Sequence, residues 1–245
     1  MDAEFYCVAC KTPFLNQHPL DEAGRCLLCR LGIAGFDGVY SYGSYEGALR
    51  TLIHLFKYEK VHTLARPLGD MLARSLPREE RFDVVVPMPL HWRRRWERGF
   101  NQSELLAKVI ARRWNVPVAG AARRVKATAP QAGLTNSKRR KNMSGAFAPS
   151  RPLLHRDLGG RFVFGKKFSL KGARVLLVDD VLTTGATAAA CARALKRAGA
   201  KHVTLAAVAR TDRRMAVTDF RADFETTSRD STEAATAATA GGITT

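Results

Sequence analysis

The run VLLVDDVLTTGAT, from Val175 to Thr187, constrains the fold more than any other stretch of this chain. Its first four residues are apolar, which is typical of a strand buried on both faces of a parallel sheet. Small residues then open a helical stretch that Gly199 ends, and the apolar run from His202 to Arg210 follows. Strand, turn, helix and strand in this order form a βαβ unit. The sequence therefore predicts an α/β fold with a parallel sheet flanked by helices.

Two kinds of chemistry meet at the turn inside this unit. Asp179 and Asp180 follow the apolar strand, at the carboxyl end where parallel sheets bind their ligands. Burying two adjacent carboxylates is costly, so sugar hydroxyls, a divalent cation or donors from a neighbouring loop must compensate them. The next residues combine threonine hydroxyls, a glycine and the amino end of a helix, which together form a phosphate cradle: Thr183, Thr184, Gly185, Ala186 and Thr187.

A plainer interpretation gives each half of this motif a structural role. The threonines would cap the helix, and the aspartates would mark a strand end that faces water. The contiguous combination after an apolar strand favours the ligand-binding interpretation. The run has neither the G-x-x-x-x-G-K-[ST] of phosphate-loop nucleotidases nor the G-x-G-x-x-G of dinucleotide folds, so both of those classes are excluded.

Further strands and helices are predicted upstream from the period of the apolar residues. A strand begins at Val39, and helices follow in GALRTLIHLFKYEK and TLARPLGDMLARSL. The apolar run Phe82–Val86 predicts another strand. HWRRRWERGF predicts a basic turn, after which Asn101 and Glu104 resemble the capping box of the next helix. Residues 120–145 are poor in large apolar side chains and predict a basic loop.

Four of the five cysteines lie within the first thirty residues, at the spacing of a four-thiolate zinc site. Two CxxC pairs are separated by fifteen residues, and their members are Cys7, Cys10, Cys26 and Cys29. Two disulfides are the alternative, but a chain without an export signal is expected in the reducing cytoplasm, where such bridges are rare. Four thiolates leave zinc no open position for water, so the predicted ion is structural and braces a small knuckle.

The composition is that of a globular protein with an excess of positive charge. The chain has 245 residues, 46% of them hydrophobic and 25% charged, which excludes wholesale disorder, collagen-like sequence and coiled coil. No apolar stretch approaches the ~18 residues of a membrane span, and a cytoplasmic location is expected. The net charge of +18 predicts polyanionic partners such as phosphates, nucleotides or nucleic acid.

The positive charge is concentrated in residues 91–141, where fourteen lysines and arginines stand against two acidic residues. This segment is a candidate surface for an anion. A solvated face that keeps the protein soluble is the alternative interpretation. The tail, residues 226–245, is rich in threonine and alanine and is predicted to be disordered.

VLLVDDVLTTGAT resembles the phosphoribosyl-pyrophosphate motif of type I phosphoribosyltransferases. Over nearly the whole chain, the sequence is also similar to the ComF family of competence-related phosphoribosyltransferase-like proteins. The shared runs are LFKYEK at 55–60, DVVVPMPL at 83–90, RGFNQSELLA at 98–107 and GAF at 145–147. The shared single residues are Arg124, Gln131, Leu134, Arg139 and Asn142.

The resemblance implies a site for phosphoribosyl pyrophosphate. Asp179 and Asp180 would contact the ribose hydroxyls, and residues 183–187 would hold the 5′-phosphate. Arg124 and Arg139 belong to a mobile basic loop that would close over the pyrophosphate. Mg²⁺ would be bound mainly by the ligand's own oxygens, because this ion keeps waters and needs few protein ligands.

The implied activity is Mg²⁺-dependent transfer of phosphoribose to an acceptor that the sequence does not name. The alternative belongs to another class: a non-catalytic DNA-uptake factor that binds single-stranded DNA through residues 91–141. Competence proteins would then be partners, and a homodimer is expected by analogy with type I relatives. The predicted domains are the zinc knuckle at 1–35, a phosphoribosyltransferase-like domain at 36–225 and the disordered tail at 226–245.

Overall fold

The computed structural model describes residues 5–9, 13–14, 20–30, 35–90, 92–125, 145–150, 155–156, 162–163, 169–183 and 185–211. Residues 1–210 form one compact unit, and residues 211–245 form a second, of which only Thr211 is described. The predicted disordered tail therefore lies outside the described residues. The expected domain boundaries after residues 35 and 225 stay predictions.

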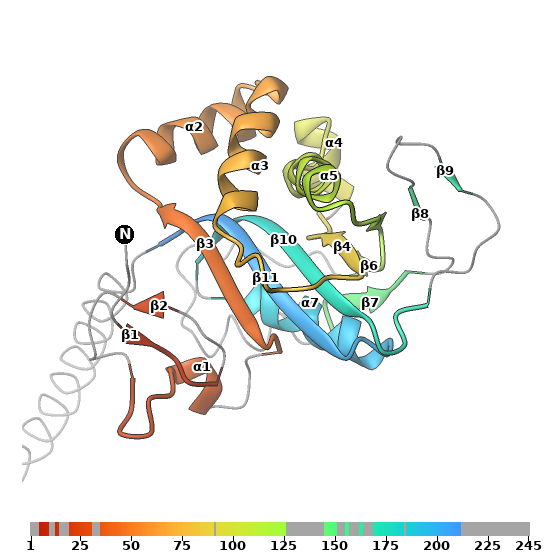
Figure 1. Cartoon of the computed structure of the whole chain (residues 1–245). Helices are drawn as coiled ribbons and strands as arrows, with labels where there is room; N and C mark the ends of the chain where they lie inside the picture. The colour runs from red at the N-terminus through yellow and green to blue at the C-terminus, as the bar shows by residue number, and fades with distance from the viewer. Residues whose placement is uncertain are drawn as a thin grey trace, which may run out of the picture. The chain divides into compact units, whose positions relative to one another are not determined.

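A seven-stranded sheet lies at the centre of the first unit (Figure 1). Its strand order is β3, β11, β10, β4, β5, β8 and β9; the first five run parallel, and β8 and β9 pair antiparallel at one edge. The strands are β3 (Gly38–Ser44), β4 (Val84–Pro87), β5 (Val118–Ala119), β8 (His155–Arg156), β9 (Phe162–Val163), β10 (Arg174–Leu182) and β11 (His202–Arg210).

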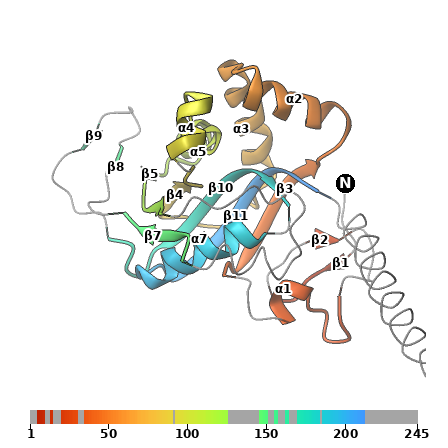
Figure 2. The same cartoon turned by 180° about the vertical axis from the view of Figure 1, so that it is seen from behind.

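Helices cover both faces of this sheet, as the two opposite views in Figures 1 and 2 show. One face carries α2 (Gly47–Tyr58), α3 (Ala65–Arg74), α4 (Trp92–Arg98) and α5 (Gln102–Trp114), with the short 3₁₀ helix His62–Leu64 before α3, and the other carries α7 (Ala186–Arg197). None of the helices in the described part of the chain is both long and apolar enough to cross a membrane.

The apolar run of β10 is buried on both sides, as its sequence predicts. Val175 and Leu177 belong to the core on the α7 side, whereas Leu176 and Val178 belong to the core under α2, α3 and α5. Side chains of a strand alternate between its two faces, so a run of four apolar residues supplies both cores. The predicted α/β fold with a parallel sheet flanked by helices is confirmed.

The cysteine-rich segment adds three short elements to the α7 side of the unit. These are β1 (Phe5–Tyr6), β2 (Pro13–Phe14) and α1 (Leu27–Arg30), and β1 pairs antiparallel with β2. Cys7 and Cys26 are fully buried and belong to the same core as the alanine face of α7. The segment therefore packs on the main body of the unit.

Two expectations from the sequence are wrong. The predicted basic turn contains the helix α4, because Trp92–Arg98 holds no glycine or proline and consists mainly of residues that tolerate a helix. Gly99, at φ +77°, ends it. The predicted loop over residues 120–145 is wrong only at its start, where β6 (Ala122–Arg124) pairs with β7 (Phe147–Pro149); residues 126–144 lie outside the described residues. The partner strand lies beyond the basic stretch, so no local sequence pattern predicts the pairing of these two strands.

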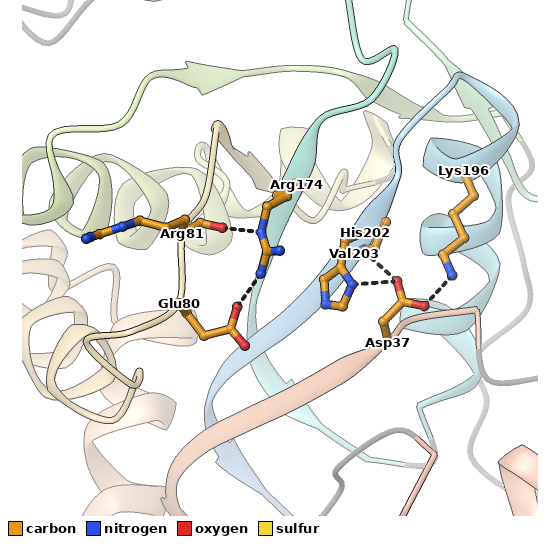
Figure 3. A network of polar contacts seen from close by, with 7 residues as sticks. All are labelled: Asp37, Glu80, Arg81, Arg174, Lys196, His202 and Val203. Atoms are coloured by element: carbon orange, nitrogen blue, oxygen red, sulfur yellow. Dashed lines mark hydrogen bonds and ion pairs between the residues drawn. The ribbon is translucent and has the colours of Figure 1, made fainter.

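Polar contacts tie the amino ends of the strands together (Figure 3). The Asp37 carboxylate accepts from the Lys196 ammonium at 2.6 Å and from the backbone N–H of Val203 at 2.8 Å. Arg174 donates its Nε hydrogen to the carbonyl of Arg81 at 2.7 Å. The contacts of Asp37 join β3, α7 and β11, and the contact of Arg174 joins β10 to the segment that leads into β4.

Candidate functional site

The neighbouring strands β4 and β10 send the chain to opposite faces of the sheet. β4 is followed by α4 and α5 on one face, which lead to β5, whereas β10 is followed by α7 on the other face, which leads to β11. The chain therefore diverges between these two strands. In parallel sheets, a crevice for ligands opens at such a point, outside the carboxyl ends of the strands.

A pocket of about 210 Å³ lies at this point. The loop after β4 forms one wall, and the end of β10 with the turn into α7 forms the other. Three basic side chains from α2, α4 and β6 complete the lining. The lining residues are Lys57, Met88, Pro89, Leu90, Arg98, Arg124, Asp179, Asp180, Val181, Leu182, Thr183, Gly185, Thr187 and Ala188.

Both predicted acids line this pocket, and each has its own partner. The Asp180 carboxylate lies 2.9 Å from the Lys57 ammonium, and both side chains are only 13% exposed. The Asp179 carboxylate accepts hydrogen bonds from the Ser103 hydroxyl at 3.2 Å and from the backbone N–H of Asp180 at 2.9 Å. A cation and a hydroxyl thus compensate two acids that the strand places side by side.

Asp179 holds its proton more tightly than an ordinary aspartate does. Burial raises the pKa of Asp179 to about 7, and the neighbouring charge of Asp180 acts in the same direction. The hydrogen bonds and Lys57 oppose this shift without cancelling it. Burial, the largest single cause, would lower the pKa of Lys57, but the charge and hydrogen bond of Asp180 together with the charges of Asp179 and Tyr45 outweigh it, so that this pKa is raised. Lys57 therefore stays charged beside Asp180.

The turn between β10 and α7 brings a helix amino terminus to the pocket. Gly185, at φ +76°, is the N-cap residue of α7, so no threonine side chain occupies that position. Thr183, Gly185 and Thr187 line the pocket, and Ala186 is the first residue of the helix. No described threonine therefore takes the N-cap position of α7. Thr184 lies outside the described residues.

Two further basic side chains line the pocket together with the acids. Arg124, on β6, lies with its guanidinium carbon 5.6 Å from the ring centre of Phe147. Arg98, at the end of α4, donates to the Gln102 side chain at 3.2 Å and lies 5.3 Å from the ring centre of Tyr58. Aromatic rings and an amide thus position both guanidinium groups. Arg139 and most of the predicted basic loop lie outside the described residues.

Lys57, Arg98 and Ser103 are site residues to which the sequence reasoning gave no role. All three fall in the runs LFKYEK and RGFNQSELLA, which the resemblance singled out without assigning them a function. Asn101 is correctly predicted as a cap, since its side chain accepts from the backbone N–H of Ser103 at 3.1 Å. Its amide also donates to the carbonyl of Met88 at 3.1 Å and thereby fastens the loop after β4 to α5.

Three of the four predicted zinc ligands converge in space. The sulfur atoms of Cys7, Cys26 and Cys29 all lie within 4.8 Å of one another. The backbone N–H of Cys26 donates to the sulfur of Cys7 at 3.2 Å. The fourth, Cys10, lies outside the described residues. A set of converging thiols suits zinc.

Comparison with known proteins finds a family whose sequence model covers part of this pocket. The sequence model of the family described as phosphoribosyl transferase domain matches residues 101–235, more than half of the chain. The chain belongs to this family. The matched span holds both acids and the turn into α7, while Lys57 and Arg98 precede it.

The curated relatives of this phosphoribosyl transferase domain protein carry names that refer to competence or to DNA utilization. Competence protein F of Haemophilus influenzae is 29% identical over 212 residues, which cover 84% of each chain. DNA utilization protein YhgH of Salmonella typhimurium is 31% identical over 215 residues, again 84% of each chain. The expected similarity to competence-related proteins is therefore confirmed.

A solved structure is similar over part of its length. This is the glutamine phosphoribosylpyrophosphate amidotransferase of B. subtilis complexed with ADP and GMP, at 21% identity and a TM-score of 0.38. The match covers 59% of the present chain and 26% of that one, so the chain spans about a quarter of its length.

Proposed function

We propose that the pocket between β4 and β10 binds phosphoribosyl pyrophosphate with Mg²⁺, and that the protein transfers phosphoribose to an acceptor. The observation that carries this proposal is the meeting of an acid pair and a helix amino terminus in one pocket at the point where the chain diverges. The acids suit the hydroxyls of a sugar, and the amino end of α7 suits its phosphate.

Each group around the pocket has a task in this reaction. Asp179 and Asp180 accept hydrogen bonds from the ribose hydroxyls, and the turn at residues 183–187 binds the 5′-phosphate. Arg98 and Arg124 are placed to stabilise the charge that grows on pyrophosphate as its bond to the sugar breaks. Mg²⁺, carried by the oxygens of the ligand, supplies further positive charge to the leaving group.

A pyrophosphate-release assay with a panel of nucleobases and amines tests the activity. We expect release with at least one acceptor and a requirement for Mg²⁺. Arg124→Ala should reduce release at least about tenfold, because one charge-assisted contact to the leaving group is lost. Arg123→Ala is the matched control, since this neighbour on β6 is exposed and does not line the pocket. Equal loss in both variants would contradict the assignment.

A second function is proposed because two relatives are named competence protein F and DNA utilization protein YhgH. In this alternative the protein binds single-stranded DNA through residues 91–141 and does not turn over. Within the described part of this segment, Trp96 is 86% exposed on the basic helix α4 and offers a surface on which a base can stack. Binding of the sugar phosphate without release on any acceptor would favour this function.

Titration of a fluorescent (dT)20 oligonucleotide at several salt concentrations tests the second function. Affinity should fall steeply as salt rises, and Trp96→Ala should weaken binding by about fivefold or more. Tyr42→Ala is the control, because this tyrosine is also exposed but lies on β3. Affinity that is independent of salt, or equal effects of the two substitutions, would count against the proposal.

The cysteine cluster is proposed to hold one structural zinc ion, with Cys10 as the fourth ligand beside Cys7, Cys26 and Cys29. Support comes from the three converging sulfur atoms. The domain division at residues 35 and 225, the cytoplasmic location and the homodimer stay predictions.

A further inference from the structure

A second basic pocket lies far from the acid pair, beyond the amino ends of β4 and β10. Its volume is about 580 Å³, within the range of pockets for small molecules. The lining combines an apolar floor, one indole ring and four guanidinium groups. The residues are Ala73, Arg74, Leu76, Arg78, Arg81, Arg113 and Trp114, and we call this set the arginine pocket.

Three segments build the arginine pocket. Arg74 is the last residue of α3, Arg78 and Arg81 lie in the segment between α3 and β4, and Arg113 lies in the last turn of α5. Because α3 and α5 pack on each other in the same buried core, their ends meet here. The four charges are therefore brought together by the fold, since no short stretch of sequence contains them.

Trp114 is fixed at the pocket. Its indole N–H donates to the carbonyl of Ala73 at 3.4 Å, and its ring centre lies 5.5 Å from that of Phe82. Leu76 is buried beside it and supplies the apolar floor. A ring held in this way is a ready wall against which a flat aromatic group can stack.

Among the described residues, these four arginines have no acidic partner. In the described part of the chain, no ion pair involves any of these four side chains, whereas the nearby Arg174 pairs with Glu80 at 2.9 Å. Figure 3 shows that Arg81 gives only its carbonyl to Arg174, while its guanidinium extends away from Arg174 and Glu80. Like charges gathered around one hollow repel each other, and an anion bound there would relieve this repulsion.

The three acids of the segment between α3 and β4, Glu79, Glu80 and Asp83, act elsewhere. The Asp83 carboxylate accepts from the backbone N–H of Arg174 at 2.7 Å. Burial raises the pKa of Tyr40, and the charges of Glu80 and Glu79 raise it further, so both carboxylates lie close enough to influence the β3 side. None of these three acids lines the arginine pocket. Its lining therefore carries positive charge alone.

We propose that the arginine pocket binds a nucleoside di- or triphosphate, with the base against Trp114 and Leu76 and the phosphates on the four arginines. A bare phosphate would leave the indole and the apolar floor unused. Guanidinium groups bind phosphate oxygens in a bidentate manner, and four of them match the three or four negative charges of such a nucleotide.

This site is separate from the proposed phosphoribosyl site. Arg174, which binds the Arg81 carbonyl, precedes Asp179 by five residues on β10. At roughly 3.3 Å per residue of strand, the two pockets lie on the order of 16 Å apart along β10. Occupancy of the arginine pocket goes beyond the proposed transfer reaction and does not depend on it.

Tryptophan fluorescence gives a direct test, because the chain has only three tryptophans. In the double variant Trp92→Phe plus Trp96→Phe, all tryptophan fluorescence comes from Trp114. Titration with ATP and with GTP should change its emission and saturate for at least one of them. Adding Arg78→Glu and Arg81→Glu should weaken that binding by more than about tenfold. Circular dichroism checks that each variant is folded.

The matched control reverses two charges elsewhere. Arg197→Glu plus Lys201→Glu changes the net charge by the same amount at two exposed residues near the end of α7, and should leave affinity within about twofold. Equal weakening in both variants would mean that only the overall charge matters and would overturn the proposal.

Two further probes distinguish the source of the phosphates. Inorganic triphosphate lacks a base and should bind at least about fivefold more weakly than the nucleotide, because stacking is lost. A (dT)20 oligonucleotide should not displace the nucleotide at equal phosphate concentration. Triphosphate binding as tight as nucleotide binding would reduce the pocket to an anion site. Displacement by the oligonucleotide would assign it to nucleic acid. Either result would overturn the proposal.

Discussion

The single aspartate that most affects the chemistry of the site is Asp179. Asp180 has a lysine partner, whereas Asp179 relies on one hydroxyl and one backbone N–H. With its pKa raised to about 7 by burial and by Asp180, Asp179 is partly protonated near neutral pH. A carboxyl group in that state can both donate to and accept from a sugar hydroxyl.

Asp179→Asn should change how stability depends on pH. The folded protein holds the Asp179 proton more tightly than the unfolded chain does, since the pKa is raised from 3.8 to about 7. Wild-type stability therefore falls as pH rises from about 4 to about 7, and the variant lacks this loss. The free energy of unfolding of the variant, compared with that of wild type, should therefore rise by about 2 kcal/mol from pH 4 to pH 8. This value is smaller than the full pKa shift implies because the Asp179 side chain is partly exposed. Urea denaturation at both pH values measures it, and a difference independent of pH would contradict the shift.

Lys57→Met should destabilise the protein by about 2 kcal/mol at neutral pH, because it leaves two neighbouring carboxylates without their cation. Lys57→Arg should restore most of this loss. Lys108→Met is the control, since the pair of Lys108 with Glu104 is more exposed and should contribute below about 0.5 kcal/mol. The measurement is the free energy of unfolding in urea. If Lys57→Met and Lys108→Met lowered the free energy of unfolding equally, the pair of Lys57 with Asp180 would contribute no more than a surface ion pair.

At the scale of an element, helix α7 has a glycine with positive φ near each end, and only one of them belongs to the site. Gly185 is the N-cap residue and lines the pocket, at φ +76°. Gly199 follows the helix at φ +106°, and a Cβ there would lie 3.0 Å from the Cα of Lys171. In the proposed site, the first position serves the phosphate as well as the turn. The second serves the turn and the close approach of Lys171.

Substituting these two glycines separates binding from folding. Both Gly185→Ala and Gly199→Ala should lower stability by about 1 kcal/mol or more, because alanine is strained at these φ values. Only Gly185→Ala should also lower the affinity for ribose 5-phosphate, by more than about tenfold, since the methyl group of the alanine would lie in the phosphate cradle. Thermal unfolding and calorimetric titration measure the two effects. Unchanged affinity in Gly185→Ala would remove the phosphate from this turn.

The βαβ unit of β10, α7 and β11 could be predicted because its signals are local: an apolar run, a small-residue turn and a second apolar run. The partners of the acids could not be predicted. Ser103 is separated from Asp179 by 76 residues and contacts it only because α5 and β10 pack together. The helix α4 escaped prediction because its arginines look like a solvated turn when neighbours are unknown.

At the scale of the whole molecule, the cysteine knuckle is joined to the main core. Cys7 and Cys26 are buried with the α7 side of the sheet, and Phe5 and Leu20 pack against the same core. Because the knuckle and the sheet share this core, loss of the metal should lower the stability of the sheet as well as that of residues 1–35.

Cys26→Ser should remove zinc and lower the melting temperature, because serine is a poor zinc ligand and the knuckle buries few apolar groups of its own. Wild type should contain about one zinc per chain by elemental analysis. Cys191→Ala is the control, because Cys191 is buried in α7 and burial raises the pKa of its thiol. The zinc content of this variant should equal that of wild type. A wild-type protein without zinc, or with the same thermal stability after chelation, would contradict the structural role.

The central claim is that the crevice between β4 and β10 clasps a phosphorylated ribose. Isothermal titration of phosphoribosyl pyrophosphate with Mg²⁺ into wild type and into the double variant Asp179→Asn plus Asp180→Asn tests it most directly. We predict saturable binding at one site per chain in wild type and a loss of at least about tenfold in the double variant. Undetectable binding in wild type, or equal affinity in both proteins, would contradict the account.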